Sequence, residues 1–449
     1  MAAPDIAVPD SVGSGIAAIP GGGAEDAPIA ARAYRKVFWR LLPFLMACYA
    51  ASYMDRVNIG FAKLQMQHDL GFSETVFGLG SGIFFLGYFL FEVPSNILMH
   101  KIGARTWIAR IMITWALLSA AFIWVRSVPA FYGLRFVLGL AEAGFYPGVI
   151  LYLTYWFPAR WRGRAIAVLM SAIPLSSILG NPLSGWVMDA MNGLSGVAGW
   201  KWMFIAEAAP ALLIGIAALF YLDNSIAGAK WLDRDEKRVL EAAIAEDTRS
   251  QASGVHGVAQ AFRDPRVWFM CGVYFCFILG QYGLNFWMPT LIQSAGVKGA
   301  SAIGLVSAIP YIVTLVMMNL FGHSADKQRE RRWHLAIPAL IGAAGFVIAP
   351  TAPNVGVAIA ALSLAAAGAI TCAPLFWSLP TAFLAGAGAA AGIAVINSVG
   401  NLAGFVAPYL IGWARDTTGS AAVGMYAIAA GLVVGAACAL LMPARLVNR

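Results

Sequence analysis

Long apolar runs recur along the chain from Phe38 onward, without the period-two alternation that marks half-buried strands. A helix needs about 20 residues to cross the hydrocarbon layer of a membrane, and the runs reach that length. They predict twelve spanning helices, near residues 38–62, 74–98, 104–125, 130–157, 164–188, 201–222, 266–292, 302–323, 333–350, 355–378, 388–413 and 421–443. Their continuous apolarity favours helices over a β-barrel.

A single long polar stretch divides these runs into two groups of six. We therefore expect an all-α membrane protein whose two six-helix bundles cover residues 37–222 and 264–449, joined by a cytoplasmic loop at 223–263. In that loop Asp233 precedes Glu236 by three residues. This capping-box pattern predicts a short amphipathic surface helix.

Two short motifs repeat at nearly the same offset in the two halves. Gly185-Trp186-Val187-Met188-Asp189 ends the fifth predicted span, and Gly412-Trp413-Ala414-Arg415-Asp416 ends the eleventh, 227 residues later. Lys101 after the second span and Lys327 after the eighth are 226 residues apart. The agreement indicates a duplicated unit. Parallel six-helix repeats are one architecture of membrane transporters, whose substrate site lies at the midplane between the repeats.

The composition excludes an ordinary soluble protein. Apolar residues make up 60% of the chain and charged residues only 12%, against roughly 25% charged in typical soluble domains. The thirty Lys and Arg, which give the net charge of +8, form short clusters between apolar runs rather than a basic face with aromatics. Nucleic acid is therefore not an expected partner, and the lipid bilayer is.

The positions of the basic residues predict the topology, because Lys and Arg accumulate on the cytoplasmic side of span ends. With the N-terminus inside, 23 of the 30 fall in cytoplasmic segments and five in outside loops, namely Lys63, Arg126, Lys201, Lys298 and Arg415. We therefore expect both termini in the cytoplasm. The chain has no Lys or Arg before Arg32 and no apolar run there, so it lacks the basic and apolar regions of a signal peptide, and we expect residues 1–36 to form a disordered cytoplasmic tail.

The sequence carries no motif typical of an enzyme, a cofactor or a metal. The five cysteines lie inside apolar runs with no Cys-x-x-Cys pair, and the five histidines fall in or beside predicted loops. There is no Gly-Lys-Ser/Thr of a P-loop, no Gly-x-Ser-x-Gly and no His-Glu-x-x-His. We expect no cofactor, no metal and no enzymatic activity.

Four charged residues fall inside predicted spans: Asp55 and Arg56 in the first, and Arg135 and Glu142 in the fourth. A charge at the bilayer centre costs at least ~2.5 to 3.5 kcal/mol, so each is a candidate for function. Arg135 and Glu142 are two turns apart on one helix face, and Asn58 shares a face with Asp55. The alternative is a neutralised structural network, although two acid–base pairs are a costly way to pack helices.

The two kinds of charge favour two roles. Arginine keeps its proton and offers a planar fork that matches a carboxylate, so Arg56 or Arg135 suits an organic anion. Desolvation penalises a charged carboxylate, so Asp55 and Glu142 are candidates for cycling between protonated and charged forms. Import of an anion together with protons, against a membrane potential that is negative inside, needs acids that bind and release protons in this way.

Other polar residues within the predicted spans are weaker candidates for the site. Gln281 and Asn285 are one turn apart on the seventh span, and Asn397 and Asn401 are one turn apart on the eleventh. Interhelical hydrogen bonding explains such residues about as often as ligand binding does. The others are Tyr53, Tyr88, Tyr282, Tyr311 and Ser378. Glu92 and Glu207, which lie near predicted span ends, are interpreted as structural.

Three motifs carry a family resemblance over nearly all of the chain after Tyr34. MDRVNIGFA, EVPSNILMHKIGAR and RFVLGLAEAGFYPGVILYLTYWFPARWRGRA begin at Met54, Glu92 and Arg135 in that order. The set resembles the anion:cation symporter family of the major facilitator superfamily. The amino-acid sequence of spans two to five is most similar to that of bacterial tartrate and phthalate transporters.

The resemblance implies twelve helices in two bundles, alternating access and proton-coupled uptake of organic anions in bacteria. Matched motif by motif, it implies that Asp55 and Glu142 are coupling carboxylates and that Arg56, Arg135 and Tyr88 are substrate or network residues. The GNLAG segment implies that Asn401 faces the pocket.

The chain departs from the superfamily in two places. The loop after the second span usually has an aspartate in its basic motif, where this chain has His100 before Lys101. The second half keeps Asp326-Lys327, so we expect gating loops at two sets of residues, Lys101 with Arg105 and Asp326 with Lys327. Residues 180–185 only partly match a motif linked to exchangers, which leaves antiport open.

Taken together, the sequence predicts a monomeric secondary transporter of the bacterial inner membrane. It would take up a small mono- or dicarboxylate, such as tartrate, phthalate or a related sugar or aromatic acid, together with protons. An anion exchanger or facilitator of the same fold is the alternative. A polytopic membrane enzyme or sensor is a remote one.

Overall fold

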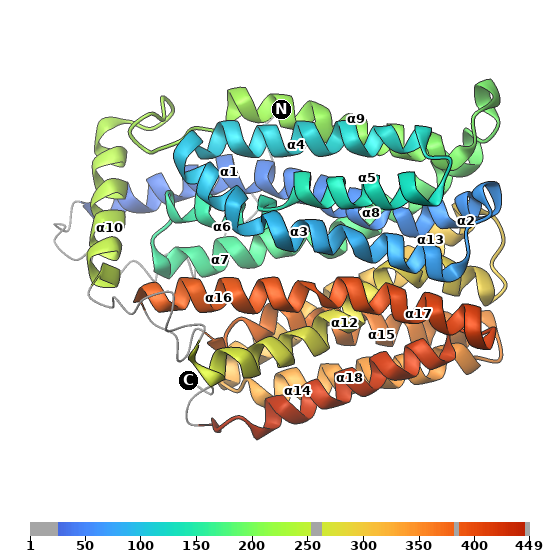
Figure 1. The fold of residues 1–449 in the computed structure, drawn as a ribbon. Helices are drawn as coiled ribbons and strands as arrows, with labels where there is room; N and C mark the ends of the chain where they lie inside the picture. The colour runs from blue at the N-terminus through green and yellow to red at the C-terminus, as the bar shows by residue number, and fades with distance from the viewer. Residues whose placement is uncertain (1–25, 253–262, 381–385, 445–449) are drawn as a thin grey trace, which may run out of the picture.

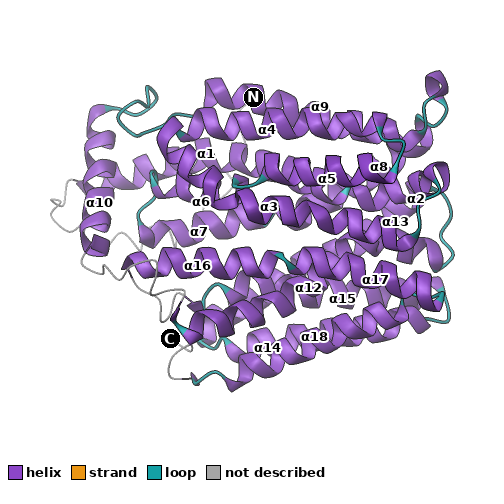
Figure 2. Cartoon of the chain, viewed as in Figure 1, coloured by secondary structure: helices purple, strands orange, loops and turns teal. Residues whose placement is uncertain are grey.

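The computed structural model describes residues 26–252, 263–380 and 386–444, and in these ranges it contains helices joined by loops and turns, without a strand (Figure 2). Twelve segments of the described chain are long and apolar enough to cross a membrane. Each overlaps one of the twelve predicted runs. The expectation of an all-α, twelve-span protein is confirmed.

The first half supplies six of these spans. Its helices are α1 (Asp26–Val57), α2 (Ile59–Leu70), α3 (Glu74–Ile102), α4 (Ala104–Ala120), α5 (Val128–Glu142), α6 (Phe145–Thr154), α7 (Ala159–Met170), α8 (Ala172–Ala190) and α9 (Gly199–Tyr221). Three of the six spans are each assigned as two consecutive helices, as in α1 with α2, α5 with α6 and α7 with α8. Short 3₁₀ turns follow α4 and α8, at η2 (Ala121–Trp124) and η3 (Leu194–Gly196).

The second half supplies the other six spans and lies beside the first, below it in Figure 1. Its helices are α12 (Pro265–Ser294), α13 (Ala300–Gln328), α14 (Arg332–Ile348), α15 (Val355–Phe376), α16 (Gly386–Asn401), α17 (Ala403–Thr418) and α18 (Ala422–Leu441), with the 3₁₀ turn η4 (Ala349–Thr351) after α14. We call the halves the N-terminal bundle and the C-terminal bundle. The helix α10 (Arg234–Ala252) connects them at one end of the molecule.

The fourth span contains a sharp break directly after Glu142. Ala143 leaves the helical region at φ −55° and ψ 135°, and Gly144 takes a left-handed φ of 82°. A Cβ atom at Gly144 would lie 2.3 Å from the Ser95 hydroxyl oxygen, so only glycine fits both the backbone and the space. Discontinuous helices often build the sites of transporters, because their ends leave polar backbone groups at mid-membrane depth.

The bundles meet most closely at the end opposite α10, which we call the far end. There α8 packs on α13 and α17 packs on α3. A Cβ atom at Gly185 would lie 2.2 Å from the carbonyl oxygen of Ala300, and one at Gly412 would lie 2.4 Å from that of Glu74. Glycine therefore allows backbone-to-backbone approach at both crossings.

The repeated motifs end in two aspartates that cap helices of the opposite bundle. Asp189 accepts hydrogen bonds from the backbone N–H groups of Ala300 (3.2 Å) and Ser301 (2.7 Å), at the start of α13. Asp416 accepts from those of Glu74 (3.2 Å) and Thr75 (2.7 Å), at the start of α3. A carboxylate at a helix N-terminus satisfies free N–H groups and favours the positive end of the helix dipole. We call this pair the Asp caps.

The capping box predicted in the central loop is present. Asp233 accepts from the backbone N–H of Glu236 at 2.8 Å, and Glu236 accepts from that of Asp233 at 3.1 Å, just at the start of α10. The bond from the Glu236 backbone and the nearby Arg32 guanidinium hold the pKa of Asp233 below its usual range. The buried Glu236 carboxylate also pairs with Arg32 and with Lys36 at 2.7 Å.

These ion pairs explain one correction to the sequence expectation. The predicted tail was 1–36, but residues 26–36 form the first turns of α1. They are helical because their basic side chains dock on α10, which the local sequence does not reveal. Residues 1–25 lie outside the described residues.

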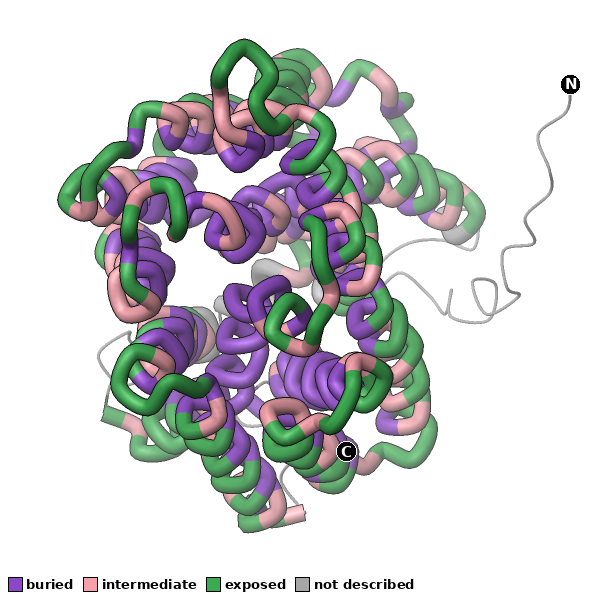
Figure 3. Tube along the Cα trace, turned by 90° about the vertical axis from the view of Figure 1, so that its right-hand side faces the viewer, coloured by how far each residue is buried: buried purple, intermediate pink, exposed green. Residues whose placement is uncertain are grey.

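The side chains on the outside of the bundles are largely apolar. Figure 3 views the molecule from the far end and shows exposed segments around the rim with buried segments toward the interior. Large hydrophobic side chains are among the exposed ones, including Leu90, Phe220, Leu305 and Leu441. A soluble protein rarely exposes so much apolar surface, and a bilayer solvates it.

The structure places several basic and acidic residues differently from the expectation. Lys63 was expected in an outside loop but is buried in α2, where it pairs with Glu74 at 2.6 Å and donates to Thr290 at 3.2 Å. The residues expected in gating loops lie in helices, at the last turns of α3 and α13 and the first turn of α4. The helices extend beyond the apolar runs because their charged ends are exposed to water.

Candidate functional site

A cavity lies between the two bundles, near the middle of the spans. It encloses about 620 Å³ when the space at its opening to solvent is included. Its polar lining comes from α1, α3 and α6 on one side and from α12 and α16 on the other. The polar lining residues are Tyr49, Tyr53, Arg56, Tyr88, Tyr146, Tyr274, Gln281, Tyr282, Asn397 and Asn401.

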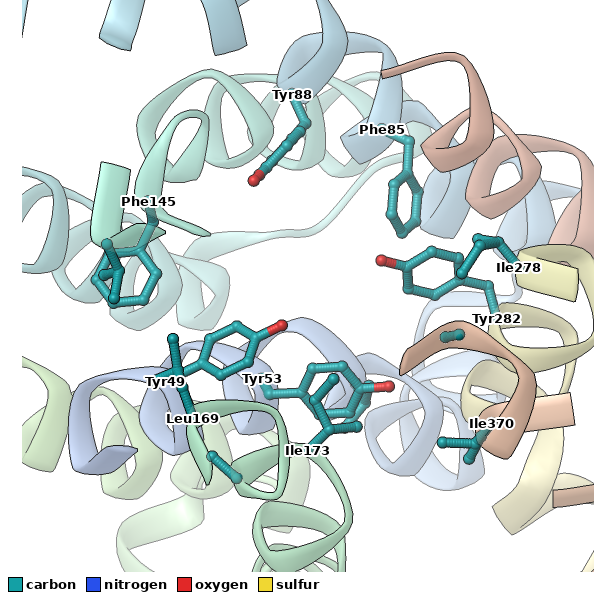
Figure 4. Packing of buried hydrophobic residues seen from close by; sticks show 14 of the residues in the cluster. Tyr49, Tyr53, Phe85, Tyr88, Phe145, Leu169, Ile173, Ile278, Tyr282 and Ile370 are labelled. Atoms are coloured by element: carbon teal, nitrogen blue, oxygen red, sulfur yellow. The ribbon is translucent and has the colours of Figure 1, made fainter. Parts of the chain in front are cut away.

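Tyrosine is the most frequent residue type of this lining. Figure 4 shows Tyr49 and Tyr88 from the N-terminal bundle and Tyr282 from the C-terminal bundle with their hydroxyl groups directed into a shared space. The ring of Tyr49 also stacks on the ring of Tyr146, with 5.4 Å between the centroids. The cavity therefore offers flat apolar ring faces beside hydroxyl groups, a combination that holds the carbon frame and the polar groups of one ligand.

Arg56 is the one cation in the cavity lining among the described residues. Its Nε donates to Glu142 Oε1 at 3.1 Å, its Nη2 makes a short contact to the same oxygen, and its Nη1 donates to the Tyr282 hydroxyl at 3.3 Å. The guanidinium lies over the rings of Phe84 and Tyr88 at 5.4 and 5.2 Å. Arg56 thus joins α1, α5 and the C-terminal bundle.

Glu142 faces Arg56 from the broken end of α5 and does not itself line the cavity. Its Oε1 atom also accepts from Ser52 at 2.7 Å, whereas its Oε2 atom is buried without a hydrogen-bond partner. Both side chains of this ion pair are almost completely buried. A buried pair of this kind is strongly destabilised when one partner is removed.

Asp55 points away from the cavity, into the N-terminal bundle. The Ser119 hydroxyl of α4 makes a short hydrogen bond to Asp55 Oδ1, and the Asn58 amide donates to the same oxygen at 3.4 Å. No ion pair in the described part of the chain involves Asp55, and its Oδ2 atom has no hydrogen-bond partner. The predicted shared face of Asp55 and Asn58 is therefore present, behind the cavity wall.

Arg135, expected to be a substrate or network residue, is fully buried and does not line the cavity. Its Nε and Nη2 donate at 3.2 Å to the backbone carbonyls of Gly80 and Ser81 in α3. The crossing of α3 and α5 is tight, since a Cβ atom at Gly139 would lie 2.0 Å from the Phe84 carbonyl oxygen. This close approach brings the guanidinium against the α3 backbone rather than toward the cavity.

The C-terminal bundle contributes neutral groups that hydrogen-bond across the interface. Gln281 donates to the Tyr53 hydroxyl at 3.3 Å, and the Asn285 amide makes a short contact to the same hydroxyl. Tyr311 donates to Asn285 Oδ1 at 2.8 Å. Asn285 therefore lies beneath the lining rather than in it, and it fixes the position of Tyr53.

Asn397 and Asn401 both line the cavity from α16, as their predicted spacing required. Asn397 donates to Glu92 Oε1 at 2.8 Å, and Ser398 donates to Glu92 Oε2 at 2.9 Å. Glu92 on α3 thus joins the two bundles on the α10 side of the cavity. The sequence alone had indicated only a structural residue near a span end.

Seven of the residues predicted for the site line the cavity, namely Tyr53, Arg56, Tyr88, Gln281, Tyr282, Asn397 and Asn401. Seven predicted residues do not line it, namely Asp55, Asn58, Arg135, Glu142, Asn285, Tyr311 and Ser378. Sequence reasoning missed Tyr49, Tyr146 and Tyr274, because tyrosines in apolar runs look like ordinary packing residues. It also missed the central position of Glu207, which lies in the middle of α9 and not near its end.

The described residues contain no group of three or more His, Cys, Asp or Glu side chains that would hold a metal ion. The architecture and the cavity define a class of protein: a multi-pass membrane transporter with a central cavity between two duplicated bundles. The chemistry of the site rests on one arginine and on the carboxylates, amides and hydroxyls around it.

The chain belongs to the major facilitator superfamily. The sequence profile described as "Major Facilitator Superfamily" matches residues 45–408. A protein of Agrobacterium vitis named "Putative tartrate transporter" is 47% identical over 92% of this chain and 94% of its own length. One of Pseudomonas putida named "Putative metabolite transport protein NicT" is 45% identical over 93% of this chain and 95% of its own.

A solved structure supports the fold. The xylose transporter XylE from E. coli, in a partially occluded inward-open conformation, superposes with a TM-score of 0.71 over 90% of this chain and 98% of its own. The two sequences are only 16% identical, so the likeness concerns the fold alone.

Proposed function

We propose that this transporter imports a small organic anion together with protons, by alternating access. The observation that carries the proposal is the position of Arg56, which lines the cavity while its guanidinium is bonded to the buried Glu142. A substrate carboxylate in the cavity would compete with Glu142 for the same fork. An arginine fork matches a carboxylate with two parallel bonds.

This competition links the anion to a proton. When a substrate carboxylate takes the guanidinium, Glu142 is left buried with Ser52 as its remaining donor. An unpaired buried carboxylate is costly, so Glu142 would bind a proton at that moment. Anion and proton would then be carried inward together, and the N-terminal bundle would return when both have left.

Asp55 fits a second coupling position. It lies on the same helix turn as Arg56, but its side chain faces the inside of the N-terminal bundle, where only neutral groups donate to it. Because the two residues are adjacent on α1, a change in the charge of Asp55 would shift the helix that carries Arg56. Arg135, whose charge lies near both Asp55 and Glu142, would hold α3 and α5 together during this change.

The lining favours a compact carboxylic acid with hydroxyl groups or a ring. Arg56 would hold one carboxylate, the tyrosine rings would cover the carbon frame, and Gln281, Asn397 and Asn401 would bond the remaining polar groups. The printed name of the Agrobacterium relative supports tartrate as the first candidate. Phthalate and related sugar or aromatic acids share the same chemistry.

We infer the orientation from charge. The α10 end carries most of the Lys and Arg and is assigned to the cytoplasm, in the inner membrane of a bacterium, with both termini inside and the chain acting as a monomer. Lys101 and Arg105 in the first half, with Asp326 and Lys327 in the second, are assigned to gating on that side. Asp326 already pairs with Arg331 at 2.7 Å.

Uptake by purified protein in liposomes tests the proposal. We expect labelled tartrate or phthalate to accumulate when the outside is more acidic than the inside, without any internal counter-substrate. A protonophore is expected to abolish the accumulation. Uptake that needs an internal anion would instead indicate exchange, and equilibration without accumulation would indicate facilitated diffusion.

Substitution of Asp55 tests the coupling site separately. Asp55→Asn keeps the size of the side chain and removes the titratable group, so we expect gradient-driven accumulation to be lost. Counterflow, in which labelled and unlabelled substrate exchange at equal pH, is the matched control because it needs no net proton movement. Gradient-driven accumulation at the wild-type level in Asp55→Asn would eliminate Asp55 as a coupling residue.

A further inference from the structure

Glu207 is a buried carboxyl group in the middle of the N-terminal bundle that the competition at Arg56 does not use. It lies on α9, which packs against α4, α8 and α1. Its side chain is 1% exposed and does not line the cavity. No ion pair in the described ranges involves it, so nothing compensates a negative charge there.

The hydrogen bonds around Glu207 indicate where its proton is. The Ser184 hydroxyl oxygen lies 2.5 Å from Glu207 Oε1 and 2.9 Å from the backbone carbonyl oxygen of Gly180. A hydroxyl has one hydrogen to donate, and both of these neighbours are acceptors when Glu207 is charged. If Ser184 donates to the carbonyl of the preceding helical turn, the second contact requires a proton on Glu207.

Few hydrogen-bond donors surround the two acids. The Asn58 amide donates to Asp55 and is also hydrogen-bonded to Glu207, so it links them. Three acceptor atoms in this group are buried without any partner, namely Asp55 Oδ2, Asn58 Oδ1 and Glu207 Oε2. Buried acceptors without donors are rare in native proteins, and a proton on a carboxyl supplies a donor.

The other buried acids differ from Glu207 in this respect. Glu142 has Arg56 and Ser52 as donors. Glu92 receives one donor on each oxygen, from Asn397 and Ser398. Glu142 is paired with a guanidinium and Glu92 has a donor on each oxygen, whereas Glu207 has no cation partner among the described residues and its Oε2 atom has no donor.

Other charged groups on the helices around α9 are engaged elsewhere or lie farther along the spans. On α2, Lys63 pairs with Glu74 and Asp69 accepts from Trp200, two turns before Glu207. On α8, Asp189 caps α13. Asp55 and Arg56 lie on α1, with Arg135 and Glu142 beyond them on α5, and Arg105 and Arg110 lie near the start of α4. The remaining charged residues are Lys201 in the first turn of α9 and, in the first half of α1, Asp26, Arg32, Arg35, Lys36 and Arg40.

We propose that Glu207 is a proton-carrying residue of the transport cycle and that, with Asp55 and the linking Asn58, it forms an internal two-carboxyl proton site separate from the substrate cavity. The assignment of a role in coupling rests on the proposed proton-coupled uptake. The site lies behind α1, so the substrate does not reach it. In the state described, Glu207 holds its proton and donates it to Ser184, which donates to Gly180.

Infrared spectroscopy of the purified transporter tests the protonation without any substrate. A protonated carboxyl has a carbonyl stretch that a carboxylate lacks. We expect such a band at neutral pH in the wild type and its loss in Glu207→Gln, whereas Glu241→Gln, at an exposed acid on α10, should retain it. A band that is absent from the wild type, or that persists unchanged in Glu207→Gln, would overturn the proposal.

Ser184→Ala provides a second variant if Glu207→Gln does not fold. Removal of the hydroxyl leaves the carboxyl in place and deletes its hydrogen-bond partner, so the band should shift in frequency. An unshifted band in Ser184→Ala would contradict the assignment of the proton to this contact.

Transport of labelled tartrate then tests the role in coupling. We expect Glu207→Gln to lower the accumulation ratio at a fixed pH gradient at least about tenfold while counterflow persists. Wild-type accumulation by the variant would remove Glu207 from the coupling machinery. A wild type without gradient-driven uptake would contradict the proposed function instead, and the infrared band would still report the state of Glu207.

Discussion

The two bundles are copies of one architecture but divide the chemistry unequally. Among the described residues, the buried charged side chains within the spans all belong to the N-terminal bundle, namely Asp55, Arg56, Lys63, Glu92, Arg135, Glu142 and Glu207. The buried polar residues of the C-terminal bundle are amides, hydroxyls and one histidine, His334. Duplication therefore left one half to carry charge and the other to provide neutral hydrogen-bonding groups.

The halves remain alike where they close on each other. Asp189 of the N-terminal bundle and Asp416 of the C-terminal bundle make the same two bonds to the helix starts of the opposite bundle, at 3.2 and 2.7 Å in both cases. In the proposed transport cycle both bundles must close the far end, whereas the proposed coupling to protons needs acids in one bundle only. The Asp caps therefore stayed alike in the two bundles, while the buried charged residues diverged.

Loss of the cavity arginine should produce the largest effect. We expect Arg56→Gln to lower uptake at least about 100-fold, because hydrogen bonds to charged groups contribute about 1.5–3 kcal/mol each. The variant should also be less stable by about 3–5 kcal/mol, since Glu142 stays buried without its partner. Uptake and thermal unfolding in detergent measure the two effects.

The double variant Arg56→Gln with Glu142→Gln separates charge balance from substrate binding. It should recover much of the stability and none of the uptake. Uptake by Arg56→Gln within a few-fold of wild type would show that charge in the N-terminal bundle is not what binds the anion.

A substitution in the lining of the C-terminal bundle should have a smaller effect of a different kind. Asn401→Ala removes a neutral hydrogen-bonding group, worth about 1 kcal/mol, so we expect KM to rise about fivefold. The dependence of uptake on the pH gradient should not change, in contrast to Asp55→Asn. A shifted pH dependence in Asn401→Ala would mean that the C-terminal bundle also takes part in coupling.

The Asp caps should give the smallest effect, and one that is equal in the two halves. Asp189→Asn and Asp416→Asn each remove a charge at a helix N-terminus, worth about 0.3–1 kcal/mol. Each is expected to raise the population open at the far end about two- to fivefold. Distances between spin labels at Arg126→Cys and Lys298→Cys, on exposed far-end positions of the two bundles, measure that population.

The distance measurements also test whether the two Asp caps are equivalent. If only one of the two substitutions changes the distance distribution, the Asp caps are not equivalent and the far end is held mainly by one crossing. If neither changes it, glycine packing alone holds the far end closed.

The sequence by itself determined the twelve spans, the central helix with its capping box and the short set of charges within the membrane. It did so because these features depend on local properties: run length, hydropathy and the spacing of a few polar residues along one helix. The internal repeat could also be recognised from the sequence, since similar short motifs recur at nearly the same offset.

Only the tertiary structure decided which of these residues meet. Adjacent residues on α1 face different directions, so Arg56 reaches the cavity and Asp55 enters the bundle. The tight crossing of α3 and α5 turns Arg135 toward the backbone carbonyls. Glu92 and Glu207, interpreted from their sequence positions as structural, became the bridge to α16 and the candidate proton site. Helix packing fixes these relations through rotation and interhelical contact, and the linear pattern of one helix contains neither.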